Sequence, residues 1–192
     1  MSLELSTLLR KSASEHTHLC PRQVLGVRMG LAGLAALEVK IPVTTRTALV
    51  IIETGGCFAD GIRAATGATV GHRTLRVEDL GKIAATFTDL RKGTSLRLAP
   101  KSDVRTRALA YAPSEKRRYF AQLQGYQLMP DEELFNYKWV ILEIPAEMII
   151  SQKNARALCS KCEEEIINER EVVVEGKVLC QTCAFGGYYR FS

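Results

Sequence analysis

The distribution of apolar positions predicts two helices in the first part of the chain. Residues 1–15 are polar with leucines at helical spacing, which indicates a short helix. Pro21 opens a second helix that we expect to reach about Val39, because proline is well accommodated in the first turn of a helix. Apolar side chains recur along this second helix at Val24, Leu25, Val27, Met29, Leu31, Leu34 and Leu37.

Three glycines leave one side of the second helix nearly without side chains, which is called its bare side below. Gly26, Gly30 and Gly33 lie at helical spacing, with alanines beside them. Each glycine costs a helix interior about 1 kcal/mol relative to alanine. We therefore expect that a sheet or another helix packs closely against this side.

A buried strand and a short helix follow. Thr47–Glu53 is a continuous apolar run rich in β-branched residues, which is typical of a buried strand. The segment Thr54-Gly55-Gly56 breaks this run, and a helix is predicted from Cys57 to Thr66. Gly67 is expected to end that helix.

The rest of the core alternates between hairpin and helical signals. A strand over 82–88 and a strand over 94–98 are joined by the turn Arg91-Lys92-Gly93, which predicts a hairpin. We further expect polar helices over 100–110 and 114–124, a helical turn from Asp131, and a last buried strand over 138–144. Because strands are few and one hairpin is evident, the pattern favours an α+β fold with a mostly antiparallel or mixed sheet packed by helices.

The cysteines near the end of the chain predict a metal site. Cys159 and Cys162 form one CxxC pair, and Cys180 and Cys183 form another after 17 intervening residues. This spacing is typical of a four-Cys structural zinc site, in which no coordination position is open for chemistry. Glu175-Gly176 is the expected turn of a valine-rich hairpin between the pairs. The alternative is two disulfides in a secreted chain.

These patterns divide the chain into three parts. Residues 1–145 form the α+β core, residues 146–158 form a linker with room for a helical turn, and residues 159–192 form the zinc finger. The 192 residues are 46% hydrophobic and 24% charged, a normal globular balance. No run of about 18 apolar residues is present, and the first residues do not resemble a signal peptide. A cytoplasmic protein with reduced cysteines is therefore expected.

Net charge is a weak guide to function. The formal charge of +5 arises from 26 basic and 21 acidic residues, and basic residues gather between Lys101 and Arg118. Such a run is usually a solvated helix face, and the alternative is a contact with nucleic acid or another anionic ligand.

A second group of candidate ligands lies in the core. His16, His18 and Cys20 alternate along the chain, so they would project to one side of an extended segment. Cys57 follows a glycine turn and opens a helix, where backbone N–H groups are expected to lower the pKa of its thiol and the loop to accept an anion. Together these groups are candidates for a transition-metal site or for a nucleophile with a base. The alternative is a small buried cysteine and a surface histidine, and His72 is expected to be a loop residue.

Five motifs follow one another in the first half of the chain: His16-Thr-His18-Leu-Cys20-Pro21, Gly26-Val-Arg-Met-Gly30, Cys57-Phe-Ala-Asp60-Gly-Ile62, Thr66-Gly-Ala-Thr-Val-Gly71 and Gly81-Lys82-Ile-Ala-Ala-Thr-Phe87. In this order they resemble the FmdE family of formylmethanofuran dehydrogenase proteins. The four-Cys tail is similar to the treble-clef-like zinc finger that many members carry.

The resemblance implies an α+β core, a homodimer, and a pocket formed by the His-x-His-x-Cys segment and Cys57. Asp60 and Lys82 match family positions and are further pocket candidates. His18, Cys20 and Cys57 would hold a second transition metal, beside the structural zinc. Two departures are evident: Arg22 replaces a glycine, and Ala68 replaces a cysteine.

Two functions follow as expectations. The first is an accessory protein or metal-dependent, oxidoreductase-related protein that works with the molybdenum or tungsten formylmethanofuran dehydrogenase of methanogenesis and contacts its other subunits. The second is a binding module whose zinc finger and basic run contact nucleic acid or a partner protein. Neither function is expected to involve a membrane.

Overall fold

The chain folds into two units. The computed structural model describes residues 3–14, 16, 18–150 and 155–189. The first unit extends to Ala146 and the second begins at Glu147. No helix in the described part of the chain is both long enough and apolar enough to cross a bilayer.

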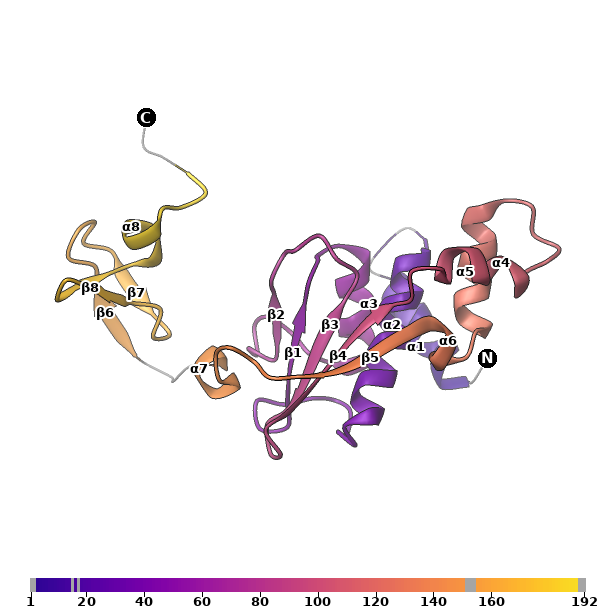
Figure 1. Ribbon diagram of the computed structural model, residues 1–192, viewed down its shortest axis with the longest axis horizontal. Coiled ribbons are helices and arrows are strands. Elements are labelled where there is room, and N and C mark those ends of the chain that lie inside the picture. The colour runs from indigo at the N-terminus through magenta and orange to yellow at the C-terminus, as the bar shows by residue number, and fades with distance from the viewer. Residues whose placement is uncertain (1–2, 15, 17, 151–154, 190–192) are drawn as a thin grey trace. The chain divides into compact units, whose positions relative to one another are not determined.

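The first unit contains a five-stranded mixed sheet with the order β2-β1-β3-β4-β5 (Figure 1). Its strands are β1 (Ala48–Ile52), β2 (Leu75–Val77), β3 (Ala85–Asp89), β4 (Thr94–Pro100) and β5 (Phe135–Val140). β1 and β2 are parallel, whereas every other neighbouring pair is antiparallel. The expected α+β fold with a mixed sheet is confirmed.

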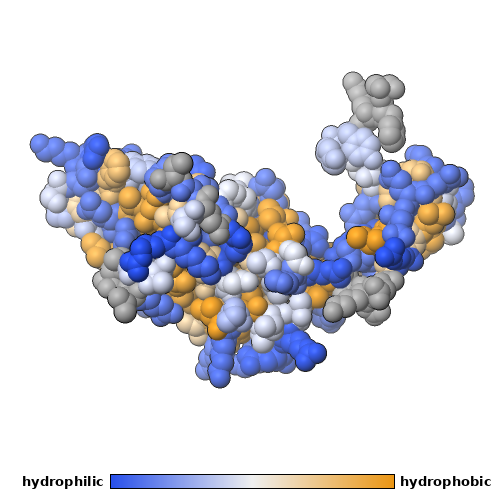
Figure 2. All heavy atoms as spheres, turned by 180° about the vertical axis from the view of Figure 1, so that it is seen from behind, coloured by the Kyte–Doolittle hydropathy of each residue, from blue (hydrophilic) through white to orange (hydrophobic). Residues whose placement is uncertain are grey.

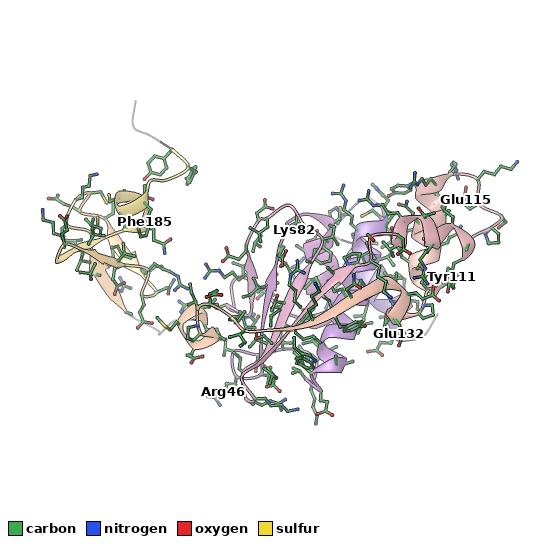
Figure 3. All side chains as sticks on the ribbon, in the orientation of Figure 1. Arg46, Lys82, Tyr111, Glu115, Glu132 and Phe185 are labelled. Atoms are coloured by element: carbon green, nitrogen blue, oxygen red, sulfur yellow. The ribbon has the colours of Figure 1, made fainter. Side chains whose placement is uncertain are left out.

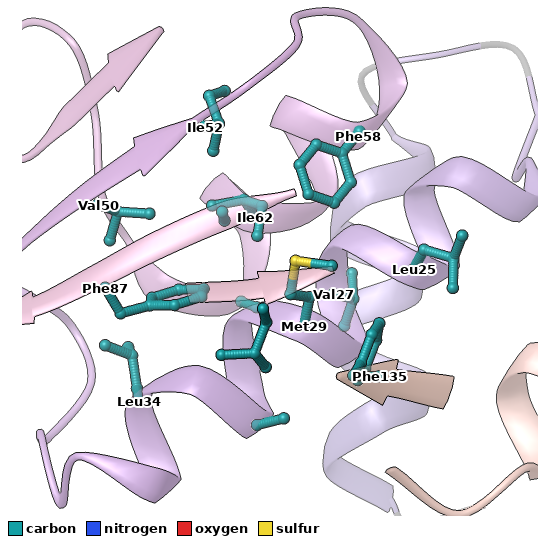
Figure 4. Close-up of a cluster of buried hydrophobic side chains, with 14 of the residues drawn as sticks. Leu25, Val27, Met29, Leu34, Val50, Ile52, Phe58, Ile62, Phe87 and Phe135 are labelled. Atoms are coloured by element: carbon teal, nitrogen blue, oxygen red, sulfur yellow. The ribbon is translucent and has the colours of Figure 1, made fainter. Parts of the chain in front are cut away.

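Three helices from the first part of the chain lie behind this sheet (Figure 1). They are α1 (Leu3–Ala13), α2 (Pro21–Ala36) and α3 (Cys57–Thr66). The bounds of α3 agree with the sequence prediction, because Gly67 has the left-handed backbone (φ 72°) that ends a helix there. Buried side chains from these helices and the sheet form one core, which includes Met29, Phe58 and Phe87 (Figure 4).

Three further helices connect β4 to β5. These are α4 (Val104–Ala110), α5 (Arg118–Leu128) and α6 (Asp131–Leu134). Arg28 of α2 holds this connection in place, since its guanidinium donates to the carbonyls of Tyr126 and Met129 at 2.8 and 2.7 Å. The same guanidinium pairs with the carboxylate of Asp131 at 2.7 Å.

Glycines allow α2 and α3 to pack with their backbones in contact. A Cβ atom added to Gly61 would lie 2.9 Å from the Cα of Gly26 and inside the contact distance of the Gln23 carbonyl oxygen. Gly30 lies further along α2 and meets Ala65, further along α3. Because the contacts advance in the same direction along both helices, the helices run parallel and their N-terminal ends are neighbours. The close approach expected on the bare side of α2 is therefore made by α3 and by the ring of Phe87, which meets Gly33.

The last strand differs from the prediction. β5 begins at Phe135 rather than at residue 138, and only Phe135 is buried. Trp139 is opposite Leu96, which is opposite the core residue Phe87, so all three share one face of the sheet. Trp139 is nevertheless 66% exposed, because β5 is the edge strand. An apolar strand at the edge of a sheet has the same sequence pattern as a buried strand, so the sequence alone does not distinguish them.

Other differences are smaller. The strand predicted from Lys82 begins only at Ala85. The first polar helix begins later than expected but ends at Ala110 as predicted, whereas the second begins and ends a few residues later than expected. β2 was not predicted, because three residues with no strand-like alternation give almost no local signal.

The second unit consists of short elements around the four cysteines. They are α7 (Ala146–Ile150), which spans the division between the units, β6 (Arg156–Leu158), β7 (Glu165–Ile167), β8 (Val172–Val174), β9 (Lys177–Leu179) and α8 (Gln181–Phe185). β6 pairs with β7, and β8 pairs with β9. The predicted turn between β8 and β9 is confirmed, since Glu175 and Gly176 both have positive φ, as a two-residue hairpin turn requires. Two hairpins followed by a short helix form the expected treble-clef-like arrangement.

Replacing Gly61 with alanine tests the contact between α2 and α3. Alanine should favour the helix by about 1 kcal/mol. The added Cβ has no room against the backbone of α2, and overpacking of this kind costs about 1–3 kcal/mol or more. We expect Gly61→Ala to lower the free energy of unfolding by about 2 kcal/mol, measured by chemical denaturation.

Gly71→Ala is the matched control, because a Cβ added at Gly71 meets no atom within 4 Å. Its effect should stay within about 0.5 kcal/mol. Equal stability of the two variants would show that the helices are not in close contact.

Candidate functional site

The four C-terminal cysteines form a tetrahedral candidate metal centre. Cys159 and Cys162 lie on the turn between β6 and β7, and Cys180 and Cys183 lie at the start of α8. Their four sulfur atoms lie within 4.8 Å of one another. The Cys162 and Cys180 sulfurs are 3.9 Å apart, and tetrahedral zinc with bonds of about 2.3 Å separates its sulfurs by about 3.8 Å. The arrangement therefore fits a four-coordinate metal ion.

Backbone hydrogen bonds hold the two cysteine pairs together. The N–H of Cys180 donates to the sulfur of Cys159 at 3.3 Å, and the N–H of Cys183 donates to the sulfur of Cys180 at 3.4 Å. The N–H of Ser160 donates to the carbonyl of Val178 at 2.8 Å, which joins the first turn to β9. The sulfurs are thus positioned by the fold itself.

The electrostatics of this centre favour a cation. Hydrogen bonds from the backbone N–H groups of Cys162 and Cys180 lower the pKa of Cys159 to about 6. The side-chain hydrogen bond with Cys180, together with burial, raises the pKa of Cys183 to about 12. One thiolate is therefore stabilised without a metal, whereas further ionisation is opposed by neighbouring sulfur. A bound divalent ion would remove that opposition.

In the core, His16 is paired with Asp60. Nε2 of His16 lies 2.7 Å from Oδ2 of Asp60, and both side chains are partly exposed. Asp60 belongs to the first turn of α3, so the contact joins the segment before α2 to the start of α3. The carboxylate can orient the imidazole through this contact.

Cys20 and Cys57 stand at neighbouring helix ends. Cys20 is the residue before α2, and its N–H donates to the side chain of Gln23 at 2.8 Å. The amide of Gln23 in turn donates to the carbonyl of Ser12 in α1 at 3.0 Å. Cys57 is the first residue of α3, and the parallel packing of α2 and α3 brings the two helix starts that carry these cysteines together.

The expected effect of this position on Cys57 is wrong in direction. Burial and a side-chain hydrogen bond with Cys20 raise the pKa of the Cys57 thiol. Its backbone hydrogen bond and the charge of Arg22 lower that pKa, but they do not prevail. The sequence identified the helix start, but the second thiol comes from a distant part of the chain.

Lys82 lies at the rim of the sheet (Figure 3). Its side chain is exposed, and its N–H donates to the carbonyl of Glu53 at 3.1 Å. Arg97 donates to both carboxylate oxygens of Glu53 at 2.6 and 2.8 Å. This hydrogen bonding lowers the pKa of Glu53, whereas burial alone would raise it. The charge of Lys82 also lowers the pKa of Glu53. Lys82 thus belongs to a charged group around Glu53, the residue that follows β1 and precedes the turn to Cys57.

The structure does not gather all predicted core ligands at one point. His18 is exposed. Among the described residues, the four finger cysteines are the only group of three or more His, Cys, Asp or Glu ligand atoms that lie within 4.8 Å of one another. The second metal site at His18, Cys20 and Cys57 therefore stays a prediction. His72 is hydrogen-bonded to the hydroxyl of Thr69 at 2.9 Å within a loop.

Tyr119 interacts with the core cysteines in a way that the sequence did not reveal. It belongs to α5 and is 42% exposed. Burial raises the pKa of Tyr119, and the charges of Cys20 and Cys57 add to this effect. Because Tyr119 comes from a distant part of the sequence, no local motif could have indicated this interaction.

The basic run on α4 and α5 is partly neutralised. Arg107 donates to the carboxylate of Glu133 at 2.6 Å. Arg117 lies 3.5 Å from the carboxylate of Glu115 and 4.1 Å above the ring centre of Phe120. From behind, the surface shows hydrophilic residues with smaller apolar areas between them (Figure 2). The run therefore resembles a solvated helix face more than a continuous anion-binding surface.

Comparison with known proteins identifies the family. Residues 15–136 match the family described as "FmdE, Molybdenum formylmethanofuran dehydrogenase operon". The chain belongs to the FmdE family. The resemblance carried by the sequence motifs is thereby confirmed.

Two similar proteins extend this result. A relative from Archaeoglobus fulgidus, named "Probable S-adenosyl-L-methionine-binding protein", is 32% identical over 97% of this chain. The FmdE-family chain spans about half of that relative, since the alignment covers 54% of it. A tungsten formylmethanofuran dehydrogenase FmdE-like protein from Syntrophus aciditrophicus has the same fold, with a TM-score of 0.59 and 19% identity. The likeness covers 97% of this chain and 95% of that one.

Proposed function

We propose that this chain is a metal-dependent accessory protein of the formylmethanofuran dehydrogenase type. Its core would act on a small molecule at the pocket where α2 and α3 begin, and its finger would be structural. The observation that supports the proposal is that Cys20 and Cys57 stand at the starts of two helices that pack in parallel through glycines. The family description supports the connection with the dehydrogenase, whose other subunits we propose as partners.

Each pocket residue has a distinct proposed role. The thiolates of Cys20 and Cys57, with the imidazole of His18, would hold a transition metal such as zinc. Three protein ligands would leave one position open for a substrate, in contrast to a closed four-Cys site. Asp60 would orient His16 through their 2.7 Å contact, so that the imidazole can move a proton. Lys82 would supply positive charge at the rim.

The finger is proposed to bind zinc. Four thiolates at tetrahedral spacing suit zinc better than harder cations such as magnesium or calcium, which prefer oxygen. Because all four positions are taken by protein ligands, this ion would stabilise the second unit and take no part in chemistry.

Metal content per chain tests the core and the finger separately. We expect about two metal ions per wild-type chain. Cys57→Ser should lower this to about one ion, because it removes a core thiolate. Cys162→Ser should also lower it to about one ion, lost from the finger. The measurement is elemental analysis after removal of loosely bound metal.

The two variants control for each other, since each should keep the ion that the other loses. Circular dichroism should show that both remain folded in the core. A full complement of metal in Cys57→Ser would refute the core site and leave the finger site standing.

S-adenosyl-L-methionine is a second candidate ligand. The observation that favours it is the Archaeoglobus fulgidus relative, whose name concerns this ligand and whose similarity runs along nearly the whole chain. Because the alignment covers only 54% of that relative, its ligand could be bound by the part that this chain does not match.

Calorimetric titration with S-adenosyl-L-methionine tests this candidate. Saturable binding by wild type, retained in Cys162→Ser and weakened at least tenfold in Asp60→Asn, would place the ligand in the core pocket. The Asp60 carboxylate is the expected partner of the sulfonium or ammonium charge. Absence of saturable heat at millimolar ligand would remove the candidate.

We also propose that the chain forms a homodimer through β5. The outer edge of β5 has no neighbouring strand within the described sheet, and Tyr137 and Trp139 are 39% and 66% exposed beside it. An exposed apolar edge strand favours pairing with another strand. Two antiparallel copies of β5 related by a twofold axis would cover both edges at once.

Trp139→Glu is expected to shift the protein from dimer to monomer, because two charged side chains would face each other near the twofold axis. The measurement is molar mass in solution by light scattering. Val70→Glu is the matched control, since Val70 is 65% exposed and lies in a loop outside the sheet. A wild-type monomer, or a dimer unaffected by Trp139→Glu, would contradict the proposed interface.

A further inference from the structure

The start of α2 and the start of α3 form a pair of thiols with unequal access to solvent. Cys20 is only 9% exposed, whereas Cys57 is partly exposed. Both cysteines are free thiols, with no disulfide between them. The accessible thiol can meet a molecule from solution, and the buried thiol can meet only its neighbour.

Backbone packing brings the starts of these two helices together. A Cβ atom added to Gly26 would clash with the carbonyl oxygen of Phe58, the residue after Cys57, and one added to Gly61 would clash with the carbonyl oxygen of Gln23, three residues after Cys20. A disulfide requires Cα atoms about 4.4–6.8 Å apart, so the two helix starts must be neighbours for the pair to form one. Cys20 also raises the pKa of the Cys57 thiol, as expected of a neighbouring side chain.

Opposing effects act on the Cys57 thiol. Burial and Cys20 raise its pKa, whereas the positive charge of Arg22 and a backbone hydrogen bond at the start of α3 lower it in part. Tyr119 of α5 responds to the charges of both cysteines. Nε2 of His16 lies 2.7 Å from Oδ2 of Asp60, which belongs to the first turn of α3.

We propose that Cys57 and Cys20 form a redox-active dithiol that exchanges with low-molecular-mass disulfides. This activity goes beyond metal binding, and it requires no metal in the core. It also concerns the core cysteines alone, since the finger cysteines lie in the other unit.

The exchange proceeds in two balanced steps. The Cys57 thiolate attacks one sulfur of a disulfide RSSR, so that a Cys57–SR bond forms and RS⁻ leaves and takes up a proton. The Cys20 thiolate then attacks the Cys57 sulfur, which forms the Cys20–Cys57 disulfide and releases the second RSH. The dithiol loses two electrons and two protons, and RSSR gains both. Burial of Cys20 makes Cys57 the attacking residue and Cys20 the resolving one.

Peptide mapping by mass spectrometry tests this proposal on the full chain. The reduced protein is incubated with excess bis(2-hydroxyethyl) disulfide at about pH 8, before and after treatment with a chelator. Trypsin then releases Cys20 in residues 12–22 and Cys57 in residues 47–63, apart from all finger cysteines. We expect these two peptides to become linked with the loss of two hydrogens.

Two variants separate the steps. Cys20→Ser should accumulate a stable mixed disulfide on Cys57, because the resolving thiol is missing. Cys57→Ser should leave Cys20 at least tenfold less modified over the same time, because Cys20 is buried. Mixed disulfides on both cysteines of the wild type without a link, or no reaction before and after chelation, would overturn the proposal.

The result is distinguishable from that of the proposed function. Linkage that appears only after chelation would show that the same thiols also hold a metal, and it supports the dithiol. Linkage without any core metal in the elemental analysis would leave the dithiol standing and remove the metal site.

Discussion

The backbone contact between α2 and α3 is the constraint on which the core site depends. Gly26 and Gly61 allow two parallel helices to touch without intervening side chains. Parallel helices place like ends of their dipoles together, which is unfavourable unless negative charge gathers there. In this protein the ionisable groups Cys20, Cys57 and Asp60 are found at those ends. The fold thus brings the ionisable groups at the two helix starts together.

The two cysteine groups illustrate opposite uses of the same chemistry. In the finger, four sulfurs face one point, and they are enough to fill every position of a tetrahedral ion. In the core, Cys20 and Cys57 stand at the starts of two helices in contact, and the pair of His16 and Asp60 lies at the start of α3. A closed set of thiolates stabilises a small unit that has little hydrophobic core of its own. An incomplete set leaves room for another molecule.

Local signals decided how much could be predicted from the sequence. The bounds of α3, its glycine end at Gly67 and the β8–β9 turn were predictable, because each depends on a few adjacent residues. The finger ligands were predictable for the same reason, since two CxxC pairs are short-range patterns. β2, the exposure of β5 and the raised pKa of Cys57 depend on which distant segments become neighbours. Tyr119 responds to the core cysteines only because the connection between β4 and β5 folds back onto α2.

That connection has a consequence for how the site could diversify. Residues 101–134 leave and re-enter the sheet at adjacent strands, and Arg28 fastens their far end to α2 through three hydrogen bonds. The segment can therefore change in length or sequence without altering the order of the strands or the crossing of α2 and α3. Since α5 in this segment carries Tyr119, whose pKa responds to the charges of Cys20 and Cys57, the segment can change the surroundings of the proposed site separately from the scaffold. New specificities can be explored in this part of the chain while the reactive groups stay in place.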